Sequence, residues 1–280
     1  MPTQRILYVD QDIASDAAGS GTVGDPYSRW WYAIEQEHGL NRDYVALDEE
    51  LVILCRGQLR DRSATWTAPN FGARLDATRR LILRPADDQK HGGVYDSGSF
   101  FTLSFTFAAS PAIASSDRMR FWTVRDMQAR VANSSTSAGA FALAWGRWER
   151  CIFSREGRSA GTPSGGNCFG NATAADMEFE AISCQFIGSW VRAVYGVANA
   201  SARVVVYNCT AIGGVNGFVV TQNAGTPTLR LFNNRSERNA AWGGSDFILT
   251  GADIASDANI SSDATSPQVA LRSLTGTFVN

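Results

Sequence analysis

Residues 204–214, VVVYNCTAIGG, combine a short β-branched and aromatic run with a polar turn, and four other segments share this plan. These are RFWTVRDMQAR (120–130), GRWERCIFSREG (146–157), FEAISCQFIGSW (179–190) and LRLFNNRSERN (229–239). Each run ends at a side chain that we align as equivalent: Asp126, Cys151, Cys184, Cys209 and Asn234. The steps between them are 25, 33, 25 and 25 residues, and such self-similarity is typical of solenoids.

The repeat length and the residue types favour strands over helices. Helical repeats need two helices in about 33 to 45 residues, whereas most steps here are shorter. The β-branched and aromatic runs are typical of strands and are too short for buried helices. Equivalent cysteines on successive coils would stack about 4.8 Å apart, so we expect a ladder of buried, reduced thiols and no metal site. The longer step contains residues 159–176, whose Gly, Ser, Thr and Pro content predicts an inserted loop.

Further segments extend this solenoid. LVILCRG (51–57) and RRLILRPADD (79–88) are expected to form earlier coils, and FFTLSFTF (100–107) alternates like a strand with one exposed face. We therefore predict an all-β parallel solenoid over residues 46–250. Residues 1–45 are expected to form an N-terminal strand and a capping helix, and residues 251–280 a C-terminal cap or extended tail.

The capping helix is predicted from SRWWYAIEQEHG (28–39). Asp25 or Ser28 is a suitable N-cap, and Gly39 a suitable stop at the C-terminal end. Trp31, Ile34 and Leu40 would then lie over the end of the solenoid. A solenoid needs such an atypical segment at each end, because its apolar interior would otherwise meet water.

Charge and motif content exclude several function classes. The net charge is −2, and no run of like charge predicts nucleic-acid or membrane binding. The sequence contains no window of 18 apolar residues and no basic-then-apolar signal at residues 1–12, so we expect neither export by a signal peptide nor a membrane span. Phosphate-loop and zincin motifs are missing, and Asp10, Asp12 and Asp16 lack the calcium-loop pattern. We therefore expect no cofactor and no metal.

Catalysis on such a scaffold would need acids on neighbouring coils of one face. Asp126, Glu149 and Glu178 are the candidates, because glycoside hydrolysis requires two carboxyl groups about 5 to 9.5 Å apart. The alternative is that these acids pair with arginines across coils and keep the surface soluble. His38 and His91 are the only histidines, and we expect structural roles for both. The eight tryptophans either pack in the core and cap or form a surface that binds sugar or a partner chain.

The N-terminal third resembles the opening of the pectate-lyase-like right-handed β-helix superfamily. The resemblance lies in Tyr8-Val9-Asp10, Gly19-Ser20-Gly21-Thr22, Gly24-Asp25-Pro26-Tyr27, the helix that follows, and residues 51–57. The later coils look like the repeats of that superfamily, so the resemblance covers most of residues 7–240. It implies a right-handed parallel β-helix. It does not choose a function, since the superfamily includes polysaccharide lyases, glycoside hydrolases, bacteriophage tailspikes and non-enzymatic virion proteins.

Residues 258–280, ANISSDATSPQVALRSLTGTFVN, are similar to the C-termini of phage-encoded β-helix proteins. We therefore expect a non-enzymatic structural or accessory protein of a bacteriophage particle, made in the host cytoplasm and incorporated into the virion. Its expected partners are copies of itself in a trimer, other virion proteins and a cell-surface glycan. The alternatives are a polysaccharide-degrading lyase or hydrolase using Asp126, Glu149 and Glu178, and a carbohydrate-binding module without catalysis.

Overall fold

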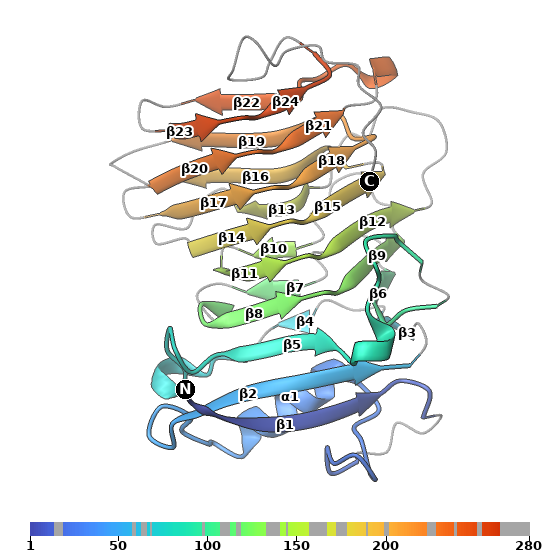
Figure 1. Ribbon diagram of the computed structural model, residues 1–280, viewed down its shortest axis with the longest axis vertical. Coiled ribbons are helices and arrows are strands. Elements are labelled where there is room, and N and C mark those ends of the chain that lie inside the picture. The colour runs from blue at the N-terminus through green and yellow to red at the C-terminus, as the bar shows by residue number, and fades with distance from the viewer. Residues whose placement is uncertain are drawn as a thin grey trace.

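The computed structural model describes residues 1–13, 19–57, 60–62, 66–67, 69–96, 99–106, 113–115, 119–132, 141–143, 145–156, 167–171, 178–188, 190–198, 202–222, 228–237, 240–250 and 254–263. Among these residues, no helix is long and apolar enough to cross a membrane. The chain winds through three parallel sheets, and each strand pairs with the equivalent strand one coil away. Figure 1 shows the coils rising from β1 to β24 with a right-handed turn, as parallel crossovers almost always have. The predicted all-β parallel solenoid is confirmed.

The first sheet has nine strands and contains the runs that the sequence repeat identified. They are β1 (Thr3–Asp10), β2 (Glu49–Arg56), β5 (Leu81–Pro85), β8 (Trp122–Arg125), β11 (Trp145–Glu149), β14 (Glu178–Ile182), β17 (Arg203–Tyr207), β20 (Thr228–Phe232) and β23 (Ile254–Asp257). Residues 51–57 and 79–88 supply β2 and β5, so the earlier coils are confirmed.

The second and third sheets complete each coil. The second contains β3 (Arg60–Arg62), β6 (Thr102–Thr106), β9 (Gln128–Ala132), β12 (Ile152–Glu156), β15 (Gln185–Gly188), β18 (Thr210–Ile212), β21 (Arg235–Glu237) and β24 (Ile260–Ser261). The third contains β4 (Trp66–Thr67), β7 (Ile113–Ser115), β10 (Phe141–Leu143), β13 (Asn167–Asn171), β16 (Arg192–Ala198), β19 (Asn216–Gln222) and β22 (Phe247–Thr250). Short 3-10 helices occur at Gly72–Arg74, Asp87–Gln89 and Ala240–Trp242.

A sharp corner joins the first sheet to the second in most coils. One residue there has a positive φ near 50–57°, which asparagine and aspartate tolerate better than most residues. The corner residues are Asp126, Arg150, Ser183, Asn208, Asn233 and Ala258. The sequence alignment of Asp126 with Cys151 is therefore wrong by one residue. Glu149 pairs with Arg125, so Asp126 aligns with Arg150, and the buried Met127 aligns with Cys151.

The residue after each corner points inward and builds an interior ladder. Its members are Met127, Cys151, Cys184, Cys209, Asn234 and Asn259, all buried. The amide nitrogen of Cys184 lies 3.4 Å from the Sγ of Cys209, and the amide of Cys209 donates to the Oδ1 of Asn234 at 2.9 Å. The predicted stack of reduced, buried thiols is confirmed, since all five cysteines are free and buried. The described residues contain no cluster of three potential metal ligands.

The thiols are expected to be unreactive until the chain unfolds. Burial raises the pKa of Cys55 and Cys168 well above its ordinary value, which removes the reactive thiolate. A thiol dye such as DTNB should label less than about one cysteine per native chain within minutes and all five in denaturant. A Thr22→Cys variant, which adds an exposed thiol, should gain one fast equivalent as the control. Rapid labelling of two or more native wild-type thiols would contradict this arrangement.

The N-terminal helix closes one end of the core, as predicted, but with different capping. Helix α1 (Trp30–Gly39) lies behind β1 and β2 in Figure 1. Its N-cap is Arg29, without a side-chain hydrogen bond, because Asp25 instead accepts a 2.8 Å bond from the amide of Ser20. Ile34 is buried, whereas Leu40 is 62% exposed, so its predicted place over the core is wrong.

Two other predictions fail locally. Residues 159–176 do not form only a loop, because they contain strand β13, whose Cys168 is buried in the core. The segment 100–107 does not expose one face over its described side chains, since Phe101, Thr102, Leu103 and Ser104 are all buried. At the other end, β23 and β24 continue the coils to Ser261, and residues 264–280 lie outside the described chain.

Candidate functional site

The first sheet carries two of the predicted acids on its outer face. Trp148 and Phe179 point inward and are buried, so Glu149 and Glu178 point outward, because side chains alternate along a strand. The two strands are neighbours, but Glu178 pairs with Trp145, four residues before Glu149. With a rise of about 3.3 Å per residue and a strand spacing of about 4.8 Å, their Cα atoms lie about 14 Å apart. This Cα separation is larger than the distance of about 5 to 9.5 Å between carboxyl groups that the two-acid reaction requires.

Arginines neutralise these outward acids across coils. Arg120 binds the carboxylate of Glu178 with nitrogen–oxygen distances of 3.1 and 3.2 Å. Glu149, whose side chain is 11% exposed, lies 3.4 Å from the Nε of Arg125 and pairs with Arg147. Each acid therefore ends in an ion pair with another coil, which is the structural role that the sequence offered as the alternative.

The network continues along the sheet through Glu180. Its carboxylate lies 3.2 Å from Arg147 and also pairs with Arg203 one coil further on. Arg147 therefore links Glu149 to Glu180, and Glu180 lies between arginines from the coils on its two sides. Cross-strand pairs of opposite charge stabilise a sheet, and the arrangement leaves neither carboxylate without a counter-ion.

Asp126 is separated from the other two acids because it occupies a corner. It binds Arg150 through two hydrogen bonds of 2.5 and 2.9 Å. Burial alone raises the pKa of Asp126, but hydrogen bonds and charge from Arg150, with Lys90 and His91 nearby, outweigh burial and hold the pKa below its ordinary value. A depressed carboxylate pKa adds stability above the unfolded-state pKa, and this stability is lost as the pH falls.

A pocket of about 330 Å³ opens beside Asp126, and we call it the corner pocket. Its surface is mostly apolar with charged groups among the lining. The lining residues are Lys90, His91, Gly92, Gly93, Asp126, Arg150, Ile152, Ser183 and Gln185. One wall comes from residues 90–93, between β5 and β6, and the other from residues at the corners of three later coils.

Hydrogen bonds hold this wall against the coils. His91 is 7% exposed, and its Nδ1 accepts a 3.2 Å bond from the amide of Gly93. The Nε2 must then carry the proton that is donated to the carbonyl oxygen of Arg150 at 2.8 Å. The side chain of Gln185 donates to the carbonyl of Gly93 at 3.1 Å. Both ring nitrogens of His91 are thus used to fasten the loop.

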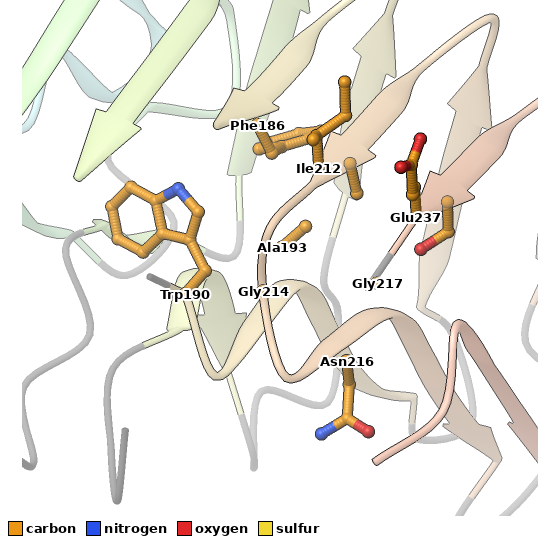
Figure 2. A pocket seen from close by; sticks show the side chains of 10 residues that line it. Phe186, Trp190, Ala193, Ile212, Gly214, Asn216, Gly217 and Glu237 are labelled. Carbon is orange, nitrogen blue, oxygen red and sulfur yellow. The ribbon is translucent and has the colours of Figure 1, made fainter. Parts of the chain in front are cut away.

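A second cleft lies between the second and third sheets, near the C-terminal coils. Figure 2 shows Trp190 and Glu237 on opposite sides of Phe186, Ile212 and Ala193. The space among them is too small for a water-sized molecule. Glycines keep it closed: a Cβ added to Gly217 would lie 2.0 Å from the Oγ of Ser236 and 2.6 Å from the carbonyl oxygen of Asp246. This cleft is a packing contact without room for a ligand.

Gly217→Ala is expected to lower the free energy of unfolding by about 1 to 3 kcal/mol, the usual cost of overpacking. The backbone oxygen of Asp246 cannot move away without breaking the pairing of β19 with β22. Urea denaturation followed by circular dichroism measures the change. Gly24→Ala is the control, since a Cβ there meets no atom within 4 Å. Equal stability of the two variants would contradict the tight contact.

Four of the eight tryptophans pack in the core. Trp30, Trp122, Trp148 and Trp190 are buried, which confirms the core-packing interpretation for those four. The side chains of Trp66 and Trp145 lie outside the described set. On the outer face of the first sheet, Tyr207 and Phe232 stack at 5.3 Å with nearly parallel rings, so each covers a face of the other.

Sequence reasoning singled out Asp126 but missed the pocket beside it. The signal was present in the length of the segment between β5 and β6, since later coils cross the same corner in two residues. For His91, in this segment, the sequence predicted only a structural role. The sequence matches no protein-family model, no curated protein and no solved structure.

Proposed function

We propose that this protein is a non-catalytic component of a bacteriophage particle that uses a rigid β-helix for assembly or surface contact. The observation that carries the non-catalytic part is the state of the outward acids. Glu149 and Glu178 lie far apart on their sheet and are each neutralised by arginine from another coil. The rigid part rests on the continuous register of three parallel sheets.

The phage assignment rests on sequence resemblance. The opening segment around residues 8–27 is similar to the pectate-lyase-like superfamily, and residues 258–280 are similar to phage-encoded β-helix proteins. Assembly as a trimer is part of the proposal. The four buried tryptophans cannot take part in it, so the subunit contacts would use other side chains, such as the charged outer face of the first sheet.

Quantitative mass spectrometry of purified particles tests the particle role. The expected result is a fixed copy number relative to the major capsid protein, divisible by three if the trimer is correct. Hundreds of copies would indicate a capsid decoration protein, and a few to a few tens a tail or vertex appendage. Absence from washed particles would overturn the proposal.

Incubation with polysaccharide from the host surface tests the non-catalytic part. We expect no shortening of the polymer by size-exclusion chromatography, and no difference between the wild type and a Glu149→Gln, Glu178→Gln double variant. Shortening that the double variant abolishes would establish a depolymerase and overturn this part of the proposal.

A further inference from the structure

The segment around the corner pocket departs from the plan of the solenoid. Asp126, Arg150, Ser183, Asn208, Asn233 and Ala258 all turn the corner within two residues, and the β2 corner turns at Gly57. Between β5 and β6, a longer segment replaces that turn, and its residues 90–93 lie against the corners of the coils that follow. A solenoid does not need this insertion to continue, and the insertion forms one wall of a pocket with room for a ligand.

The inserted wall is fixed before any ligand arrives. Beyond the bonds of His91 and Gln185, the buried side chain of Gln128 donates to the carbonyl of Asp96 at 2.8 Å and accepts from its amide at 2.8 Å. The side-chain nitrogen of Gln128 also donates to the hydroxyl oxygen of the buried Thr102 at 3.0 Å. A preformed, mostly apolar cavity with a few fixed polar groups is the usual form of a binding site, because little order has to be gained on binding.

The charges of the lining select an anion. Arg150 uses its Nε and Nη2 for Asp126, so its Nη1 keeps donors available, and its side chain is 54% exposed. Lys90 is 41% exposed and pairs with Asp87 outside the pocket. With Asp126 ionised, Lys90 and Arg150 leave the lining with one net positive charge among these three groups. A carboxylate is therefore favoured at this point, next to the apolar part of the pocket surface.

We propose that the corner pocket receives a peptide segment of a partner protein, in which an apolar side chain lies beside a carboxylate. The apolar side chain would fill the cavity against its apolar surface, and the carboxylate would bind Arg150 and Lys90. A sugar fits this surface less well, because its hydroxyl groups need many polar partners and the lining is mostly apolar. The partner part of this inference rests on the proposed role in particle assembly, whereas the pocket itself does not.

Titration of the ¹⁵N-labelled protein with 4-methylpentanoate tests the pocket by NMR. This probe carries the apolar group and the carboxylate of the proposed segment. We expect saturable shifts of the Gly92 and Gly93 amides, at least about tenfold weaker binding of 4-methylpentanamide and acetate, and no comparable binding of glucuronate. No saturable shift, equal binding of the amide, or preference for glucuronate would each overturn the proposal.

Two variants test whether Lys90 and Arg150 bind the carboxylate of the probe. Lys90→Gln and Arg150→Gln should each weaken binding of 4-methylpentanoate about five- to tenfold, and Arg230→Gln, an exposed arginine on the first sheet, should not. Because Arg150→Gln leaves Asp126 without its partner, the double variant Arg150→Gln, Asp126→Asn removes both charges and provides a second test. Unchanged binding in the folded variants would overturn the assignment of the anion to these cations.

Incorporation into particles tests the partner. Lys90→Gln protein should enter particles less efficiently than wild type or Arg230→Gln. If it binds the probe weakly and yet enters particles normally, the pocket is a binding site but the proposed partner is wrong. If the wild type itself is missing from particles, the proposed function fails, and the titration alone decides the pocket.

Discussion

Asn234→Ala is expected to lower the free energy of unfolding by about 3 kcal/mol, because it leaves buried polar groups without partners. The side chain of Asn234 accepts a hydrogen bond from the amide of Cys209 and donates to the carbonyl of Val206, at 2.9 and 3.0 Å. It also donates to the Oδ1 of Asn259 at 2.9 Å. Alanine cannot make any of these bonds, and water cannot reach the interior ladder. Urea denaturation monitored by tryptophan fluorescence measures the loss.

The neighbouring corner residue provides the matched control. Asn233 is exposed, has a φ of 53° and donates to Asn208 at 2.6 Å. Asn233→Gly keeps a residue that adopts this φ without strain and removes only a surface bond, so a change below about 1 kcal/mol is expected. If the two variants lose similar stability, the interior ladder does not contribute as described.

Arg5→Ala should destabilise the N-terminal cap by roughly 3 to 5 kcal/mol, the cost of leaving a buried charge unpaired. Glu37, on α1, is completely buried and accepts two hydrogen bonds from Arg5 at 2.9 and 3.0 Å and one from Tyr44 at 2.5 Å. The bonds to Glu37 raise the pKa of Arg5, and burial together with Glu37 raises the pKa of Tyr44. Without Arg5, only the phenol would remain to stabilise the carboxylate.

Arg42→Ala is the control for a pair of the same chemistry nearer the surface. Arg42 binds Glu49 through two bonds of 2.7 and 2.8 Å, but both side chains are partly exposed to water. Its loss is expected to cost less than about 1 kcal/mol. Hydrogen exchange should show faster exchange at the amides of α1 and β1 in Arg5→Ala and not in Arg42→Ala. A global loss of protection without this local change would contradict a role in the cap.

The sequence was sufficient to predict the solenoid because similar side chains recur at the same position of successive coils. Cys151, Cys184, Cys209 and Asn234 recur where the chain turns inward, and each belongs to the same ladder. The alignment failed at Asp126 because aspartate suits the corner position, while a methionine, which carries no turn signal, occupies the ladder. Strand β13 was missed because its glycine and asparagine content is typical of loops, although its cysteine is buried.

The candidate site could be predicted less completely. The sequence placed Glu149 and Glu178 on neighbouring strands of one face, and the 33-residue step from Cys151 to Cys184 already implies the four-residue offset between them. The arginines that bind each acid could not be identified from the repeat. The corner pocket depends on where the segment after β5 folds back, and its contacts join residues as distant as Gly93 and Gln185. Local patterns carry no information about such contacts.

The pairing of each strand only with its neighbours one coil away makes this molecule behave like a row of linked units. In such a row, the stability of a unit depends on the interfaces on its two sides, and unfolding can start at an end and advance. Residues 91–96 of the inserted segment bond to Gln128, Arg150 and Gln185 on three successive coils, and so they tie three units together at once. We therefore expect the middle of the solenoid to resist mechanical pulling longer than its C-terminal coils, which have no comparable clamp among the described residues.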